Sequence, residues 1–209
     1  MNDDLIFAII ALLFGIYFAR MWMSDLRDWQ KGKPHPKALP GSTPTTWRAV
    51  WIAVAGSLVI LGIETLGEYA LGISEEQKDI AVILLVPMIM AAFVEELIFR
   101  GFLVVGNRGK AALWGSILFF SVLFALAHSH LWSYQVQTEG GNRIFEWHFT
   151  VKAFWSAGMV FLLSVWLYAA RFLKSNPHRS LLPCMAGHLA KNLGVFVIKL
   201  AQGHVSGWL

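Results

Sequence analysis

Two adjacent glutamates and an arginine, Glu95, Glu96 and Arg100, interrupt an apolar stretch of the chain. Ionisable groups are costly inside such a stretch, so each needs a partner or a function. Residues on a helix turn by about 100° each, so Glu96 and Arg100 share a face and can pair, whereas Glu95 faces another way. A desolvated carboxyl group without a neighbouring cation suits a general base or acid that works near neutral pH. Glu95 is therefore the first catalytic candidate.

Two histidines in later apolar stretches each have a partner one helical turn away. Phe124 precedes His128 by four residues, so its ring can pack against the imidazole and orient it. His188 and Asn192 repeat this spacing, and both side chains can donate hydrogen bonds to the oxyanion of a tetrahedral intermediate. A single such histidine more often serves hydrogen bonding between helices. Their co-occurrence with Glu95 favours a hydrolase site with a base, an orienting imidazole and two donors.

The remaining polar residues of these stretches have simpler interpretations. Lys191, one turn from His188, could reach the same site, pair with a carboxylate or face a polar crevice. His130, His148 and His204 are expected at the membrane interface, where they would take no part in the chemistry.

The elements that carry these residues are apolar runs long enough to cross a bilayer. The chain has 209 residues, of which 56% are hydrophobic and 14% charged, well below the roughly 25% charged residues of soluble domains. Runs of about 17 to 25 apolar residues cover Leu5–Met23, Trp47–Ile63, Ile80–Val105, Ala111–Leu131, Val151–Leu173 and Leu181–Leu200. Because backbone amides in hydrocarbon need internal partners, we predict an all-α, polytopic transmembrane bundle of about six spans. The stretch Ser24–Thr46 is expected to be a polar loop.

The polar residues of different spans must be able to meet. A short turn near residues 106–109 makes the third and fourth spans antiparallel, so Glu95 and His128 can reach similar depths. Hydrolysis within a membrane also needs a path for water. We therefore predict a polar cavity bounded by the third, fourth and sixth spans.

Three motifs follow one another on these spans: Glu-Glu-x-x-x-Arg from Glu95, Phe-x-x-x-His ending at His128, and His-x-x-x-Asn from His188. In this order the chain resembles the CPBP family, the CAAX proteases and bacteriocin-processing enzymes, also called glutamic-type intramembrane proteases or the Abi family. The similarity extends over residues 86–197. We expect residues 1–209 to form a single integral membrane domain, with this family-like core and two accessory helices within residues 5–63.

The resemblance implies packed helices around a polar cavity and peptide hydrolysis without a metal, another cofactor or a covalent intermediate. Glu95 would activate a water that His128 helps to position, and His188 with Asn192 would stabilise the oxyanion. The supporting residues would be Glu96, Arg100 and Phe124. The implied function is that of a glutamic-type intramembrane endopeptidase acting on a membrane-associated protein or peptide. The alternative is a non-catalytic membrane scaffold, or a bacteriocin-immunity or regulatory protein, of the same fold.

Other hydrolase chemistries fit the chain to different degrees. Residue types alone leave a zinc site open, because Glu95, His128 and His188 form a set with two imidazoles and one carboxylate, although the resemblance argues against a metal. A site-2-type metalloprotease needs His-Glu-x-x-His, and the chain has no His-Glu dipeptide. A rhomboid-like enzyme needs an intramembrane serine in a Gly-x-Ser setting, which is missing here. An aspartyl enzyme needs paired intramembrane aspartates, and no aspartate follows Asp79.

Basic residues are distributed unevenly between the loops. Eleven lie in or beside the first, third and fifth loops: Arg20, Arg27, Lys31, Lys33, Lys37, Arg48, Arg108, Lys110, Arg171, Lys174 and Arg179. Four lie on the opposite side: Lys78, Arg143, Lys152 and Lys199. The positive-inside rule then places both termini outside, and the compact chain with short loops favours a bacterial inner membrane. The basic residues form no patch suited to nucleic acid, so the expected partners are the lipid bilayer and a membrane-anchored substrate.

Overall fold

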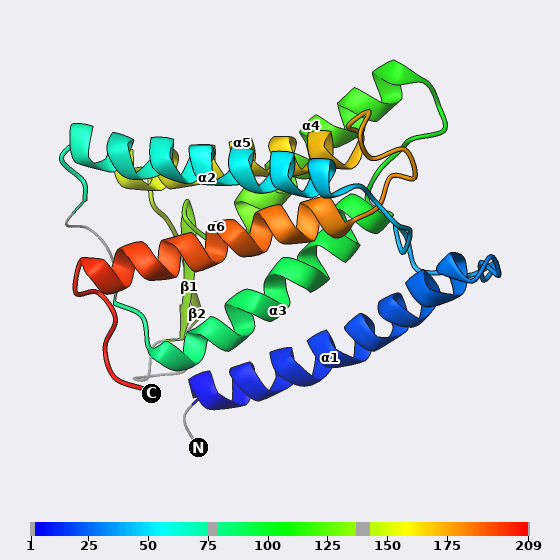
Figure 1. The fold of residues 1–209 in the computed structure, drawn as a ribbon. Coiled ribbons are helices and arrows are strands. Elements are labelled where there is room, and N and C mark those ends of the chain that lie inside the picture. Colours follow the sequence, from blue (N-terminus) through cyan, green and yellow to red (C-terminus); the bar gives the residue numbers. More distant parts are fainter. Residues whose placement is uncertain (1–2, 75–78, 137–142, 209) are drawn as a thin grey trace.

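A computed structural model describes residues 3–74, 79–136 and 143–208 (Figure 1). Its long helices are α1 (Asp3–Gln30), α2 (Trp47–Ala70), α3 (Leu85–Glu96), α4 (Lys110–Ala127), α5 (Val151–Arg171) and α6 (Leu182–Ala201). A short 3-10 helix, η1 (Val82–Leu84), leads into α3, and a π-helix, η2 (Leu97–Phe102), continues it. With these two joined to α3, the described chain has six helical segments long and apolar enough to cross a membrane. The chain is therefore an integral membrane protein, and the predicted all-α bundle is confirmed.

Helix α6 occupies the centre of the bundle. It packs against α2, α3 and α5, while α1 packs on the far side of α3 and α4 packs on α5 (Figure 1). A Cβ atom on Gly187 of α6 would lie 2.8 Å from the Ser57 Oγ and 3.0 Å from the Ala53 carbonyl oxygen of α2. Only glycine permits this approach, which is typical of helix contacts in membranes. The close contact fixes α6 immediately before His188.

The third span is not one regular helix. In η2 the Leu103 amide donates to the Ile98 carbonyl over 2.9 Å, five residues back instead of four. The Phe99 carbonyl therefore lacks its usual helical donor, and the Tyr168 hydroxyl of α5 donates to it over 2.7 Å. This wide turn ends the span beside α5.

The expected polar loop Ser24–Thr46 is wrong in its first part, because α1 continues to Gln30. The segment has no proline or glycine before Gly32, so nothing in it breaks the helix. The Asp25 carboxylate also accepts a hydrogen bond of 2.7 Å from the Leu39 amide, which ties the loop back onto the helix. A prediction from polar composition alone therefore ends the first helix too early.

A small hairpin between α4 and α5 was not predicted. Strands β1 (Trp132–Val136) and β2 (Arg143–Trp147) pair antiparallel, with Trp132 opposite Trp147 and Ser133 opposite Glu146. The expected fourth span, Ala111–Leu131, ends earlier, at the α4 C-cap His128, because Ser129 takes a left-handed conformation with φ of 53°. The chain then turns back across the bundle as a strand.

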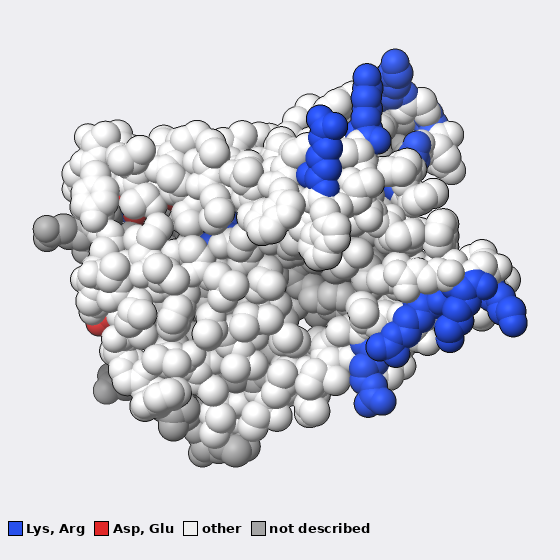
Figure 2. Space-filling view, viewed as in Figure 1, with Lys and Arg blue, Asp and Glu red and all other residues white. Residues whose placement is uncertain are grey.

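The charged surface is polarised. In Figure 2 the lysines and arginines that project from this face gather at the end of the bundle where α1 ends and α4 begins. This end carries the first, third and fifth loops, as the sequence count predicts. Of the four basic residues assigned to the opposite side, Lys78 lies outside the described residues, and so does the side chain of Arg143.

Candidate active site

Three helices bring Glu95, His128 and His188 to one point. The Oε2 atom of Glu95 on α3 lies 3.9 Å from the His128 Nε2 at the end of α4 and 3.9 Å from the His188 Nε2 on α6. Both separations exceed a hydrogen bond. This Oε2 atom is buried and has no hydrogen-bond partner among the described residues. The carboxylate therefore presents an available acceptor between two imidazoles.

Glu96 organises the layer behind this point. Its Oε1 atom lies 3.0 Å from the Arg100 Nη1 and 2.8 Å from the His188 Nδ1, and the side chains of Glu96 and Arg100 are fully buried. The predicted pairing of Glu96 with Arg100 is confirmed. A carboxylate oxygen can only accept, so the Nδ1 of His188 carries the hydrogen and its Nε2 is directed at Glu95.

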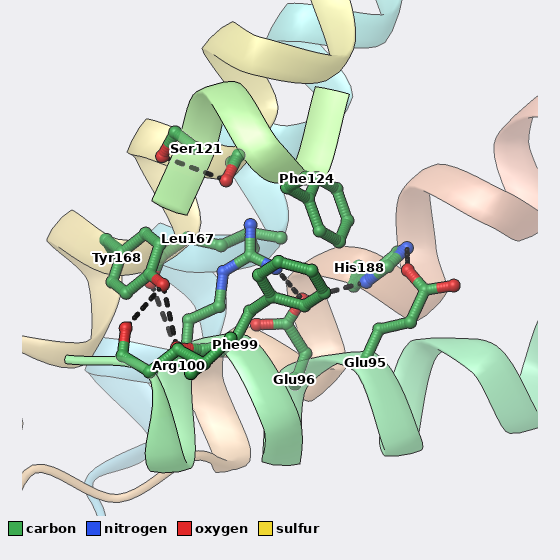
Figure 3. A network of polar contacts seen from close by, with 12 residues as sticks. Glu95, Glu96, Phe99, Arg100, Ser121, Phe124, Leu167, Tyr168 and His188 are labelled. Carbon is green, nitrogen blue, oxygen red and sulfur yellow. Dashed lines mark hydrogen bonds and ion pairs between the residues drawn. The ribbon is translucent and has the colours of Figure 1, made fainter. Parts of the chain in front are cut away.

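Phe124 lies between the Arg100 guanidinium and His188 (Figure 3) and also contacts His128. The Arg100 guanidinium lies 4.3 Å from the centroid of the Phe124 ring and 5.0 Å from that of Tyr168. Aromatic faces attract a cation, most strongly where water is absent. The Phe124 ring also lies 4.5 Å from the His128 ring and 6.1 Å from the His188 ring. The predicted contact between Phe124 and His128 is thus present, and Phe124 further packs against His188.

Two residues of α5, three apart, hold the wide turn that carries Arg100. The Tyr168 hydroxyl contacts the Phe99 carbonyl, and the Arg171 guanidinium donates to the carbonyls of Arg100 and Gly101. Sequence reasoning missed this role and counted Arg171 only as a basic residue of a loop. Its position at the end of an apolar span was the one available signal. The two side chains fix the backbone from which the buried ion pair extends.

Asn192 is one of the two predicted donors, and its amide is already partly used by another helix. The Asn192 Nδ2 donates to the Met88 carbonyl of α3 over 2.9 Å, which leaves one further amide hydrogen. The His128 Nδ1 lies 2.8 Å from the Phe124 carbonyl and donates to it, so its Nε2 is directed at Glu95. The structure therefore brings Glu95, His128 and His188 together and places Asn192 one turn away on α6.

A cavity of about 690 Å³ lies beside these residues. Its lining includes Phe124, His128, His188 and Asn192, so the predicted cavity exists. The predicted walls are wrong in part, because the described lining comes from α2, α4, the hairpin, α5 and α6, with no residue of α3. Glu95 is not among the residues that line the cavity, but both of its neighbouring histidines are.

Two ion pairs lie on the cavity wall, and neither of their glutamates was predicted to belong to a span. The second span was expected to end at Ile63, but α2 continues to Ala70 and places Glu64 and Glu68 one turn apart. The Lys191 Nζ lies 3.0 Å from the Glu64 Oε2, and Lys152 pairs with Glu68. The four-residue spacing of the glutamates was the missed signal. Of the alternatives left open for Lys191, the structure shows that it pairs with a carboxylate and also lines the cavity.

Two of the histidines that were expected at the interface line the cavity. His130 and His148 both line the cavity, and the His148 Nε2 lies 2.8 Å from the Ser133 Oγ of β1. The unpredicted hairpin brings them there. The third, His204, pairs with the exposed Asp79 over 2.9 Å, away from the cavity.

The zinc alternative can be compared with this geometry. Within the ranges that the structure describes, no group of three His, Cys, Asp or Glu side chains is arranged to hold a metal ion. Each histidine of the site directs one nitrogen at Glu95 and binds an oxygen with the other, His128 at a backbone carbonyl and His188 at Glu96.

Comparison with known proteins assigns the chain to a family. A family model described as type II CAAX prenyl endopeptidase Rce1-like matches residues 77–194, more than half of the chain. The match contains α3 to α5 and the His188–Asn192 part of α6, and it excludes α1 and α2. No curated protein and no solved structure matches. The resemblance carried by the three motifs is thus confirmed, and the chain belongs to the Rce1-like family of type II CAAX prenyl endopeptidases, within the CPBP family.

Proposed function

We propose that this chain is a glutamic-type intramembrane endopeptidase, with Glu95 as the base that activates water. The observation that carries the proposal is the buried Glu95 Oε2, 3.9 Å from the Nε2 atoms of both His128 and His188. An oxygen in that position can take a proton from a water that the two imidazoles orient. The cavity beside the histidines gives water a route to the site.

The proposed reaction needs no covalent intermediate. The oxygen of the water attacks the peptide carbonyl carbon while Glu95 accepts a proton from that water. The carbonyl oxygen becomes an oxyanion. Protonated Glu95 then gives the proton to the leaving amine as the carbon–nitrogen bond breaks. The overall change is hydrolysis to a carboxylic acid and an amine, and Glu95 returns to its starting form.

His188 and Asn192 are the proposed donors to the oxyanion. The His188 Nδ1 already donates to Glu96, so donation from Nε2 requires the imidazolium form, whose charge the Glu96 carboxylate and the oxyanion would balance. Asn192 would use the amide hydrogen that Met88 does not accept. The proposed supporting residues would only hold the two histidines in position; they are Phe124, Glu96 and Arg100.

The proposed substrate is a membrane-associated protein or peptide, which the family name supports. We also propose a bacterial inner membrane as the location, with both termini outside. The gathering of lysine and arginine at the end where α1 ends and α4 begins supports this orientation.

Cells that carry the wild-type chain or the Glu95→Gln variant provide the test of the function. We expect uncleaved membrane-anchored proteins to accumulate in the variant cells, and the new peptide ends seen in wild-type cells to be absent, because an amide cannot act as the base. Mass spectrometry of protein ends in the membrane and secreted fractions measures both. Glu146→Gln, an exposed position on β2, is the matched control and should resemble wild type. Identical cleavage products in wild-type and Glu95→Gln cells would favour the scaffold alternative.

Chelators test the metal-independent mechanism. A peptide found in that comparison should be cleaved by purified protein at the same rate before and after treatment with EDTA or phenanthroline, because Glu95 supplies the base without a Lewis acid. A zinc protease treated in parallel shows that the chelation worked. Loss of activity that added zinc restores would instead assign Glu95, His128 and His188 to a metal site.

A further inference from the structure

The hairpin between α4 and α5 has two chemically different faces. Directly opposed residues of a strand pair share a face, and successive residues alternate. Trp132 lies opposite Trp147 and Tyr134 opposite Phe145, so these four aromatic side chains share one face. Tyr134 is 51% exposed, Phe145 49% and Trp147 57%. Large aromatic side chains thus cover the outer face of a sheet of only two strands.

This aromatic face continues onto a membrane span. The Trp132 and Phe145 rings stack with centroids 5.6 Å apart, Trp147 stacks on Phe149 at 5.9 Å, and Phe149 stacks on Phe154 at 6.0 Å. Phe154 belongs to α5 and is 57% exposed on that apolar span. Whatever surrounds the apolar surface of α5 at Phe154 therefore also reaches the hairpin.

The opposite face of the hairpin belongs to the cavity. Ser133 of β1 and His148, which follows β2, both line the cavity, with the Ser133 Oγ and the His148 Nε2 2.8 Å apart. The hairpin is therefore a wall with a polar inner face and an aromatic outer face.

Two physical limits fix the environment of that outer face. The outer edges of a two-stranded sheet have unpaired backbone groups, which cannot lie against hydrocarbon. A contiguous aromatic surface is equally unfavourable in bulk water. The headgroup layer satisfies both limits, since water reaches the backbone there and tryptophan and tyrosine rings prefer it. The hairpin also joins the end of one candidate span to the start of the next, Ala127 to Val151.

We propose that the aromatic face of the hairpin, formed by Trp132, Tyr134, Phe145, Trp147 and Phe149, lies in the lipid headgroup layer. The hairpin then separates the bilayer from the cavity. The occupant of this face is lipid, and the proposal holds whether or not Glu95 is the catalytic base.

Site-specific fluorescence quenching by lipids tests this placement. Bimane is attached to single cysteines at Phe145→Cys or Trp147→Cys, with Glu146→Cys as the matched control from the other face of the same strand. Cys184 is fully buried, so unsubstituted protein serves as the labelling blank. The labelled proteins are placed in phosphatidylcholine–phosphatidylglycerol vesicles whose lipids carry a nitroxide either near the headgroup or near the end of the acyl chain.

Shallow nitroxides should quench the labels at positions 145 and 147 at least about twofold more than the label at 146, and more than deep nitroxides do. Equal and weak quenching at all three positions would place the face in water or against protein and overturn the proposal. Stronger quenching by deep nitroxides would overturn the headgroup depth. Since two aromatic positions are tested independently, failure of one variant to fold leaves the other to decide.

Discussion

Glu95→Gln is expected to lower kcat for peptide cleavage by about 10²- to 10⁴-fold, with KM and thermal unfolding close to wild type. Glutamine keeps the size of the side chain but cannot accept a proton from water. The Glu95 Oε2 has no hydrogen-bond partner among the described residues, so the substitution removes no hydrogen bond of that atom. Steady-state kinetics on a peptide identified in cells measures kcat and KM, and circular dichroism in detergent measures unfolding.

A double variant shows whether Glu95 and His128 act on the same water. When two groups act as a unit on one step, substituting both lowers activity little more than the more damaging single substitution does. We therefore expect Glu95→Gln with His128→Ala to be about as slow as Glu95→Gln alone. If the fold-losses in kcat of the two single variants multiply in the double variant, His128 acts on another step. If Glu95→Gln alone keeps the wild-type kcat, Glu95 takes no part in the chemistry.

The membrane spans could be predicted from the sequence because hydropathy is a local property. The first helix shows the limit of this signal, since α1 continues through polar residues to Gln30, where contacts with the following loop support it. The second helix shows the same limit. Its residues Glu64 and Glu68 resemble loop residues in the sequence, but in the structure they pair with Lys191 and Lys152. Hydropathy cannot show a partner that lies more than eighty residues away.

Contacts within one helix could also be predicted. The pairing of Glu96 with Arg100 and the packing of Phe124 on His128 follow from four-residue spacing alone. Two hydrogen bonds between α6 and α3 depend instead on how these helices cross, which residue spacing does not encode. They join His188 to Glu96 and the Asn192 amide to the Met88 carbonyl. The sequence therefore predicted that Glu95, His128 and His188 belong to one candidate site, but it did not predict their partners on other helices.

The wide turn after α3 and the hairpin could not be derived in this way. A π-turn exists only where other groups satisfy the carbonyls it frees, and here Tyr168 and Arg171 of α5 do so. The hairpin does alternate aromatic and polar residues, but its short strands stand out only once their pairing is known.

Arg100→Met is expected to destabilise the folded protein by about 3–5 kcal/mol, the usual cost of removing one partner of a buried ion pair. Glu96 is fully buried and would keep only the His188 Nδ1 as a charged or donating neighbour among its described contacts. The aromatic rings of Phe124 and Tyr168 would also lose the cation between them. Denaturation in mixed detergent micelles, followed by circular dichroism, measures the change in the free energy of unfolding.

Two further variants separate the buried charge from the loss of an arginine in general. Arg27→Met, at an exposed position of α1, should change stability by less than about 0.5 kcal/mol. Glu96→Gln combined with Arg100→Met should be more stable than Arg100→Met alone, because no buried carboxylate is then left without its cation. If the double variant is less stable than Arg100→Met, the cost lies in lost packing around Arg100. In that case the guanidinium stabilises the site through its aromatic contacts more than through its charge.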